Sequence, residues 1–507
     1  MSAAHGADGS LPAEAEVVVV GAGPVGLMLA GELRLGGVET VVLERLAEPH
    51  RESRAAQLSP RTVELLLQRG LRDALGAPPG RDVGHFGGIP LDVTRAGGPV
   101  PANWMVPQFR TEEILHDWAT GLGATVRRGR QVADVRDDGG SVVLDVRDPD
   151  GRVSGGTTRM RARYVVGCDG RDGVVGGLAG IALPGRPASR ELLRADVTGV
   201  HIPPRRFDRL PHGVAVAGAL PHRVTRLMVL EYGRAPVARP GPPEFGEVAD
   251  AWKRVTGDDI STGEALWTDV FDDTCRQAAE YRRGRVLLAG DAARLHMPVG
   301  GQSLNTGLHD AVNLGWKLAA QVRGWAPDGL LDTYHAERHA VGARVLDNVE
   351  AQTTLQFDGV RADPLREVFA GLLEIPAVAA HLAAMLGGVD VRYPVRRNGA
   401  DGDRAADVLG RRLPPLRDAD DPAPLPPGTG ALLSRRSAAP GTRARVEAAA
   451  VSRPGRVRLV PPEQCTALLP PGVDAALLRP DGHVVWTDTV GEGLEDALQQ
   501  WFGPPAR

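Results

Sequence analysis

The sequence predicts an α/β protein with a Rossmann-like parallel sheet, an inserted β-rich domain and a third, smaller domain at the C-terminus. Three observations support this prediction. The chain opens with a β-α-β pattern around a glycine turn, its middle part contains alternating apolar stretches, and a proline-rich stretch precedes its C-terminal part. With 507 residues, the chain is also too long for a single hydrophobic core.

The opening β-α-β unit is carried by "EVVVVGAGPVGLMLAGELRLGGVETVVLERL". A Val-rich strand runs into the glycine turn, a helix follows and ends at Gly36 and Gly37, and "TVVLE" forms the second strand. Further on, "GATVRRG", "SVVLDVRD" and "ARYVVGCDG" are typical of strands. We expect these strands to return to the same sheet or to an adjoining one.

The middle part of the chain interrupts this unit. "GVAVAGAL" and "HRVTRLMVLEYG" alternate between apolar and polar residues, which predicts a separate, mostly antiparallel sheet. "GRVLLAGDAARLH" is again a strand that runs into a turn. After it, Ala311, Leu314, Leu318 and Val322 recur at helical spacing and predict a helix over 308–322.

The C-terminal part of the chain differs in composition from the parts before it. Six prolines lie between Pro414 and Pro427, a density that no long helix or central strand tolerates. Beyond them, "DAALLRPDGHVVWTD" predicts two strands joined by a turn, and "GLEDALQQWF" predicts a closing helix. The predicted boundaries are a disordered tail over 1–14, a first domain over 15–182 and 277–393, an inserted domain over 183–276 and a C-terminal domain over 394–507.

Composition excludes several classes of function. Lys and Arg total 59 against 63 Asp and Glu, a net charge of −4, which argues against a nucleic-acid partner and favours a small molecule. Three scattered cysteines without a CxxC motif indicate no disulfide framework and no metal site, and they favour the cytoplasm. The apolar run over 17–31 is broken by glycines and Pro24, and the first residues lack a signal-peptide pattern, so we expect no membrane segment.

The glycine turn has the G-x-G-x-x-G spacing of a dinucleotide-binding loop. Gly21 permits the tight turn, Gly23 lets the backbone approach a pyrophosphate, and Gly26 lets helix and strand pack closely. Glu44 ends the second strand, where a carboxylate binds ribose hydroxyls and disfavours NADP at this site. The alternative interpretation is a glycine-rich packing turn without a ligand.

Three stretches together resemble one family. "GAGPVGLMLAGELRLGGVETVVLER", "GCDG" and "GRVLLAGDAARLHMPVGGQSLNTGLHDAVNLGWKLA" make the chain similar to group A flavin-dependent monooxygenases, and most similar to hydroxylases of aromatic polyketides such as angucyclinones and anthracyclinones. The likeness spans nearly the whole chain. It implies an FAD-binding domain, a hydroxybenzoate-hydroxylase-like middle domain whose sheet roofs the substrate pocket, and a thioredoxin-like C-terminal domain without redox cysteines.

The resemblance also implies which residues contact FAD. Asp291 follows an apolar strand directly, so its carboxylate projects from a strand end, where ligands of open α/β sheets bind. The alternative role for Asp291 is that of a helix cap. The loop over 298–306 would line the flavin ring. The implied cofactor-binding residues are Gly21, Gly23, Gly26, Glu44, Arg45, Arg54, Gln108, Asp169, Asp291, Gly301, Leu304 and Asn305.

Such a family hydroxylates by reducing FAD with NADPH, adding oxygen at the flavin C4a atom and delivering OH from the hydroperoxide. The protein supplies orientation, a dry pocket and a base or hydrogen-bond network for a phenol. His296, Pro298 and Ser303 are the candidate catalytic residues. His309 is a further histidine that could accept a phenolic proton. Candidate substrate-pocket residues, for which burial in a core is the alternative, are Trp104, Met105, His212, His222, Trp267 and Phe271.

Three places depart from the family pattern. The family writes Asp-Gly-X-Arg-Ser-X-Val-Arg, but here Asp172, Gly173 and Gly176 replace the Arg, the Ser and the final Arg. Ser303 replaces a glycine of the flavin loop, and Arg294 replaces a histidine. On the alternative interpretation, Ser303 points away from the flavin and Arg294 is a surface variant. Together, the changes question NADPH as the reductant.

Three functions therefore remain open. The first is an FAD-dependent tailoring oxygenase that hydroxylates an aromatic polyketide. The second is an FAD-binding relative that runs a non-hydroxylating or NADPH-independent step, such as Baeyer–Villiger insertion, oxidation or rearrangement. The third is a catalytically silent protein that binds a polyketide. The sequence leaves open whether the chain forms a homodimer.

Overall fold

A computed structural model describes residues 11–50, 55–148, 156–395, 408–414, 425, 427–489 and 493–505. The predicted tail over 1–14 lies outside the described residues as far as residue 10, and the first strand already begins at Glu14. Within the described part of the chain, no single helix is long and apolar enough to cross a bilayer, although the bent pair 359–373 and 376–387 meets the same criterion of length and composition.

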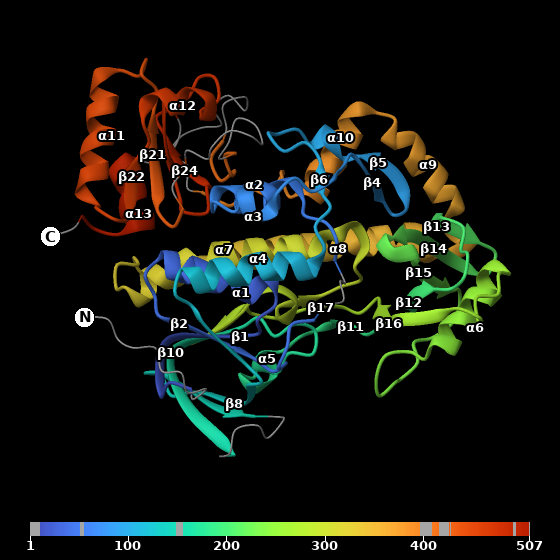
Figure 1. Cartoon of the computed structure of the whole chain (residues 1–507). Helices are drawn as coiled ribbons and strands as arrows, with labels where there is room; N and C mark the ends of the chain where they lie inside the picture. Colours follow the sequence, from blue (N-terminus) through green and yellow to red (C-terminus); the bar gives the residue numbers. More distant parts are fainter. Residues whose placement is uncertain are drawn as a thin grey trace.

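The first domain is built on a mostly parallel sheet (Figure 1). Its central strands are β1 (Glu14–Val20), β2 (Thr40–Glu44), β7 (Thr125–Arg128), β10 (Thr157–Gly167) and β19 (Val286–Leu288). They lie in the order β19-β10-β1-β2-β7, and every neighbouring pair among them is parallel. Strands β8 (Gln131–Asp137) and β9 (Val142–Arg147) extend β10 as an antiparallel flap. All three strand stretches predicted over 123–170 are confirmed.

Three helices pack together against this sheet: α1 (Pro24–Leu35), α4 (Gln108–Gly121) and α7 (Gln302–Val322). Small residues permit their close approach. A Cβ atom at Gly31 of α1 would lie 1.9 Å from the ring of Trp118, and one at Gly315 of α7 would lie 2.4 Å from the side chain of Glu32. Helix α7 begins six residues before the predicted start, because its first turn carries buried polar side chains such as Gln302 that conceal the apolar period.

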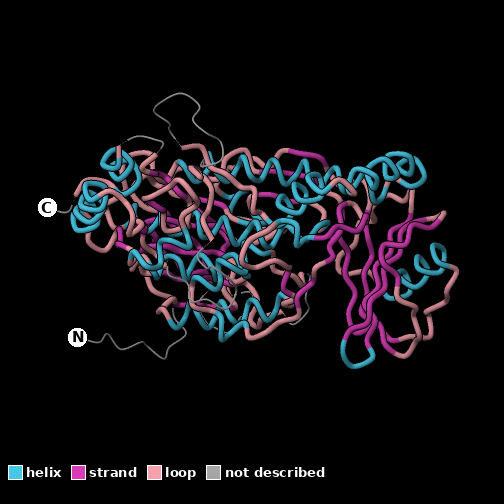
Figure 2. The backbone as a smooth tube through the Cα atoms, turned by 90° about the horizontal axis from the view of Figure 1, so that it is seen from above, coloured by secondary structure: helices cyan, strands magenta, loops and turns pink. Residues whose placement is uncertain are grey.

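The inserted sheet is antiparallel, as predicted. It has the order β13-β14-β15-β12-β16, formed by β12 (Glu191–Thr198), β13 (Arg205–Leu210), β14 (Gly213–Leu220), β15 (Val224–Glu231) and β16 (Glu264–Asp272). Helix α6 (Phe245–Thr256) covers one face with the fully buried Trp252. This sheet lies at the end of the molecule opposite the C-terminus (Figure 2).

Further segments surround the two sheets, and several of them line the central cavities. They comprise α2 (Pro60–Gln68), α3 (Arg72–Leu75), β3 (Gly80–Arg81), β4 (Val83–Phe86), β5 (Ile89–Asp92), β6 (Asn103–Trp104), α8 (Thr333–Phe357), α9 (Asp363–Leu373) and α10 (Pro376–Gly387). Three short strands, β11 (Gly185–Arg186), β17 (Cys275–Gln277) and β20 (Arg294–Leu295), connect the first domain to the insertion.

The C-terminal sheet has the order β22-β21-β23-β24, with β21 and β22 parallel and the other pairs antiparallel. Its elements are β21 (Gly430–Ser434), α11 (Pro440–Ser452), β22 (Val457–Leu459), α12 (Pro462–Leu468), β23 (Ala475–Leu478), β24 (Val484–Thr487) and α13 (Leu494–Phe502). This β-α-β-α-β-β-α order is the thioredoxin-like arrangement that the sequence predicted. Cys465 is its one cysteine and is buried and free.

Candidate active site

A groove of about 1600 Å³ runs along the carboxyl edge of the parallel sheet. Strands β1, β2, β10 and β19 all end there because they are parallel. The residues that follow each strand line the groove: Gly21 after β1, Glu44 at the end of β2, Asp169 after β10 and Asp291 after β19. Four segments that are distant in sequence thus meet at one edge, where open α/β sheets bind ligands.

The glycine loop needs its glycines for three different reasons. Gly21 has a φ of +105°, and a Cβ atom there would lie 2.4 Å from the carbonyl oxygen of Cys168. A Cβ atom at Gly26 would lie 2.0 Å from the carbonyl oxygen of Gly21, so α1 packs directly on the turn. A Cβ atom at Gly23 would meet no described atom within 4 Å. Gly23 therefore keeps space open at the N-terminus of α1.

Glu44 holds the loop in place. Its carboxylate accepts hydrogen bonds from the backbone N–H of Ala22 at 2.8 Å and of Leu46 at 2.9 Å. The side chain is nearly buried, yet it lines the groove. Because each carboxylate oxygen has two lone pairs, Glu44 retains acceptor capacity toward the groove.

Asp169 and Asp172 are close in sequence but have different roles in the structure. Asp169 caps the short helix α5 (Val175–Leu178), accepting from the backbone N–H of Val174 at 2.6 Å and of Val175 at 3.0 Å. Burial raises the pKa of Asp169. A Cβ atom at Gly173 would lie 2.5 Å from the Asp169 carboxylate, which explains the glycine there.

Arg171, the basic residue next to Asp172, already forms an ion pair within the protein. Arg171 makes a bidentate ion pair with Asp272 of β16, at 2.6 and 2.5 Å. Asp172 itself is exposed and lines the groove. The groove therefore presents a carboxylate where the family pattern has an arginine, and Arg171 bridges the first domain and the inserted sheet.

Asp291 and Ser303 contact each other across the other end of the groove. The Ser303 hydroxyl donates a hydrogen bond to Oδ1 of Asp291, so the interpretation that Ser303 points away from this site is wrong. Arg294 is not a surface variant either. It is fully buried, and its Nη1 lies 2.5 Å from Oδ2 of Asp310, which explains why a cation is tolerated there.

His296 lines the groove beside Pro298. Its Nδ1 lies 2.9 Å from the carbonyl oxygen of Met297, whereas its buried Nε2 has no hydrogen-bond partner among the described residues. Burial lowers the pKa of His296, so the ring is neutral. A neutral imidazole fixed at Nδ1 offers its other nitrogen to a ligand.

A second cavity of about 1220 Å³ adjoins the groove. The two share lining residues Ala55, Pro298, Ser303 and Leu304. Met105, predicted as a pocket residue, lines the second cavity, and so does Gly301. Helix α10 contributes Ala383 and Leu386, which give this cavity an apolar wall.

Several polar groups of the second cavity were missed from sequence. Arg81, His85 and Asn103 line it together with Phe207. They lie in the weakly patterned segment of β3 to β6, which carries no motif, and only the tertiary fold brings Phe207 from the inserted sheet to within 4.4 Å of the His85 ring. Burial, with the Arg206 and Arg81 cations, lowers the pKa of His85 to about 4. His85 Nδ1 accepts from the Gly88 N–H at 3.3 Å, which leaves Nε2 as the donor.

Comparison with known proteins is consistent with this geometry. Residues 14–349 match the FAD binding domain family, and residues 406–505 match the C-terminal domain family of aromatic-ring hydroxylases. The 12-dehydrotetracycline 5-monooxygenase/anhydrotetracycline 6-monooxygenase of Streptomyces rimosus is 40% identical over 97% of this chain and 99% of its own. The crystal structure of CabE, an aromatic hydroxylase from angucycline biosynthesis, is 43% identical with a TM-score of 0.87, covering 97% of this chain and all of that one.

The chain belongs to the FAD-binding monooxygenase family. Not every relative is named for oxygenation. A dialkyldecalin synthase of Streptomyces rugosporus is 38% identical over 97% of this chain and 99% of its own. The groove fits FAD, because Gly23 leaves open space at a helix N-terminus and Glu44 has spare acceptors at a strand end.

The predicted cofactor residues divide by position. Most line the groove: Gly21, Gly23, Glu44, Arg45, Gln108, Asp169, Asp291 and Leu304. Gly26 packs behind the turn. Asn305 is buried away from the groove, where its side chain accepts from the N–H of Ser59 at 2.8 Å and donates to the Gly301 carbonyl at 2.8 Å. Arg54 lies outside the described residues.

Five residues predicted to line the substrate pocket do not line the second cavity. His212 and His222 are exposed in turns of the inserted sheet and line neither cavity. Trp104 packs against the main core, and Trp267 lies under the Arg194 guanidinium at 4.2 Å. Phe271 lines the groove instead of the second cavity. Residue type alone did not reveal which face of each strand turns inward.

Proposed function

We propose that this protein hydroxylates the ring of an aromatic polyketide, with FAD in the groove and NADPH as reductant. The observation that carries the proposal is the shared wall of the two cavities, formed in part by Pro298, Ser303 and Leu304. A substrate in the second cavity would meet the flavin edge there. When bound, the flavin takes a hydride from the nicotinamide and activates dioxygen for transfer of one oxygen atom to the ring, which is the cofactor's own chemistry.

In this proposal the groove residues hold the cofactor by its polar parts. The amides at the start of α1 face the pyrophosphate, Glu44 accepts from the adenosine ribose, and Asp291 accepts from the ribityl hydroxyls. Gln108 and Arg45 line the same groove and add donors. The Ser303 hydroxyl orients the Asp291 carboxylate by its hydrogen bond.

The second cavity would bind a flat phenolic substrate. Met105 and Phe207 pack against the ring faces, and the apolar wall of α10 excludes water. His85 donates from Nε2 to a phenol oxygen, since its pKa near 4 keeps it neutral. Arg81 lowers the cost of phenolate formation by its charge, which makes the ring more electron-rich.

The proposal that NADPH is the reductant rests on the resemblance to group A flavin-dependent monooxygenases. Asp172 lies in the groove where the family pattern has an arginine, and it repels phosphate groups. The names of the relatives favour oxygenation over the non-hydroxylating and silent alternatives. We retain the cytoplasm as the expected location because of the cysteine pattern. The domain boundaries and a homodimer stay predictions.

The test is flavin content followed by anaerobic reduction. Purified protein should be yellow with one FAD per chain, and anaerobic NADPH should bleach the flavin, faster with a tetracyclic phenol bound. Bleaching by dithionite but not by NADPH would remove NADPH from the proposal and leave FAD binding intact. Colourless protein that takes up no added FAD would contradict the proposal altogether and favour the silent binding protein.

A further inference from the structure

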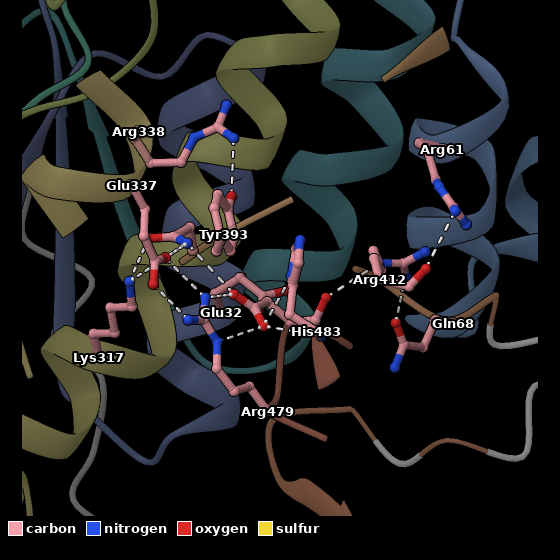
Figure 3. Close-up of polar contacts among 12 residues, drawn as sticks. Glu32, Arg61, Gln68, Lys317, Glu337, Arg338, Tyr393, Arg412, Arg479 and His483 are labelled. Atoms are coloured by element: carbon pink, nitrogen blue, oxygen red, sulfur yellow. Dashed lines mark hydrogen bonds and ion pairs between the residues drawn. The ribbon is translucent and has the colours of Figure 1, made fainter. Parts of the chain in front are cut away.

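A third cavity, of about 600 Å³, lies behind the second one. The two cavities share Ser59, Gln302, Leu386 and Gly387 as lining residues. The third cavity is bounded by α2, α7, α8 and α10 and by the C-terminal domain, whose segments reach it at residues 412 and 483. Figure 3 labels Arg61, Arg338, Arg412 and His483 among its lining residues. None of the groove residues proposed to contact FAD lines it, whereas Asn305, which lies away from the groove, does.

The lining of this cavity is basic. Its charged or titratable side chains include four arginines and two histidines, and no Asp or Glu lines it among the described residues. These six residues are Arg61, Arg338, Arg344, Arg412, His309 and His483. Such a concentration of cations is expensive unless negative charge balances it.

The protein's own carboxylates balance the cations only in part. Glu64 is shared by Arg61, at 2.6 Å, and Arg412, at 3.1 Å. Asp310 is likewise shared by Arg338, at 2.6 Å, and Arg294, at 2.5 Å. Arg294 itself does not line the cavity. Of the other lining residues, Arg344 pairs with Asp390 at 2.9 Å, and His483 lies 3.2 Å from Asp481. Two carboxylates thus serve the four buried guanidinium groups, which leaves an excess of positive charge beside the cavity.

The pKa values of Arg412 and His309 are consistent with this excess of positive charge. Burial and the neighbouring Arg61 and Arg69 cations lower the pKa of Arg412 to about 10, despite the nearby Glu64. Burial, followed by the Arg338 and Arg412 cations, holds the pKa of His309 well below its usual value. His309 is therefore neutral and does not add to the positive charge.

Polar groups at the cavity remain unpaired. The buried Nε2 of His309 and the buried Nε of Arg61 have no hydrogen-bond partner among the described residues. Arg338 donates to Asp310, Tyr393 and the Thr306 carbonyl. That accounts for three of its five N–H groups. A ligand that accepts hydrogen bonds and carries negative charge would satisfy both deficits.

We propose that this cavity is an anion-binding site for a halide or a carboxylate. A free halide could enter alone, or a carboxylate could belong to a molecule that reaches in from the adjoining second cavity. The inference goes beyond the proposed hydroxylation and does not depend on it. Bound anion would pair with Arg61 and Arg412 and would brace α2 of the first domain against the C-terminal domain, which contributes Arg412.

The test measures melting temperature of the FAD-loaded protein at constant ionic strength. The sodium salt of HEPES, a bulky sulfonate without a carboxylate group, is replaced stepwise by sodium chloride in one series and by sodium benzoate in another. At about tenfold excess over Kd, binding to the folded state should raise the melting temperature by about 2 °C. Stabilisation by chloride identifies a free-halide site, and stabilisation by benzoate alone identifies a site for an aromatic carboxylate.

Variants place the effect in the cavity. Arg344→Gln removes a lining cation whose side chain is 42% exposed and paired with Asp390, so the fold should survive. His309→Leu removes the unpaired nitrogen. Both should lose at least about half of the anion-dependent shift, whereas Arg282→Gln, which breaks the surface ion pair with Asp332, should keep it.

A crystal grown with sodium bromide gives a second readout. An anomalous peak between His309 and Arg61 would support the site directly. The proposal is overturned if neither chloride nor benzoate stabilises the protein beyond the HEPES salt, or if Arg344→Gln and His309→Leu respond like the unaltered protein.

Discussion

At the scale of single residues, His85 has a testable acid–base signature. Its pKa of about 4 in the folded protein lies below the ordinary value of 6.5, so the unfolded chain binds more protons between these pH values. Stability contributed by the neutral ring is therefore complete above pH 6.5 and is lost as the pH falls toward 4. His85→Asn should flatten the decline in melting temperature over this range. His116→Asn, at an exposed ring, is the matched control.

Asp291 gives a second prediction at this scale. Asp291→Asn keeps the size of the side chain but removes the charge-assisted acceptor proposed for the ribityl chain. Because hydrogen bonds to charged groups contribute about 1.5–3 kcal/mol, FAD affinity should fall by about 10–100-fold. Fluorescence titration with FAD measures it. Asp332→Asn, which affects only a surface ion pair, should leave affinity unchanged. Equal affinity in both variants would remove Asp291 from the site.

At the scale of elements, substitutions at two glycines of the loop should affect folding and FAD binding differently. Gly26→Ala places a methyl group 2.0 Å from the Gly21 carbonyl oxygen, so α1 must move off β1, and both melting temperature and FAD binding should fall. Gly23→Ala meets nothing within 4 Å and has a φ of −74°, which alanine adopts freely. It should keep the melting temperature of the FAD-free protein but weaken FAD binding. Unchanged FAD binding in Gly23→Ala would mean that the pyrophosphate lies elsewhere.

Some elements of the fold could be predicted from the sequence, and others could not. The Val-rich β1, the glycine turn and Glu44 are local patterns, and their predicted places in the fold are confirmed. The end of β10 was predicted too, but the pairing of Arg171 with Asp272 depends on a strand about a hundred residues away. His85 and Arg81 carry no motif and become site residues only because α10 and the inserted sheet enclose them.

At the scale of the whole molecule, a buried charge network joins the C-terminal domain to α7 and α8. Arg479 pairs with Glu337 at 2.6 Å and with Asp481, and Lys317 pairs with Glu337 at 2.8 Å. Burial alone would raise the pKa of Glu337, but the Arg479 and Lys317 cations lower it to about 2. Figure 3 shows these side chains converging from both domains.

Removing one member of this network should destabilise the whole protein. Arg479→Met leaves Glu337 and Asp481 buried without their main partner, which costs about 3–5 kcal/mol. Arg282→Met breaks an exposed pair and should cost about 1 kcal/mol or less. Urea unfolding of both variants measures the difference. Equal unfolding midpoints would show that the network does not hold the domains together.

We propose that oxygen reaches the substrate where the two cavities meet. The most direct measurement is a reaction of FAD-loaded protein with NADPH, ¹⁸O₂ and a panel of tetracyclic phenols, followed by mass spectrometry of the products. Hydroxylation at this junction predicts a product that carries one ¹⁸O atom from dioxygen and consumption of one NADPH per product. A transformed product without ¹⁸O, or with oxygen from water, would contradict it.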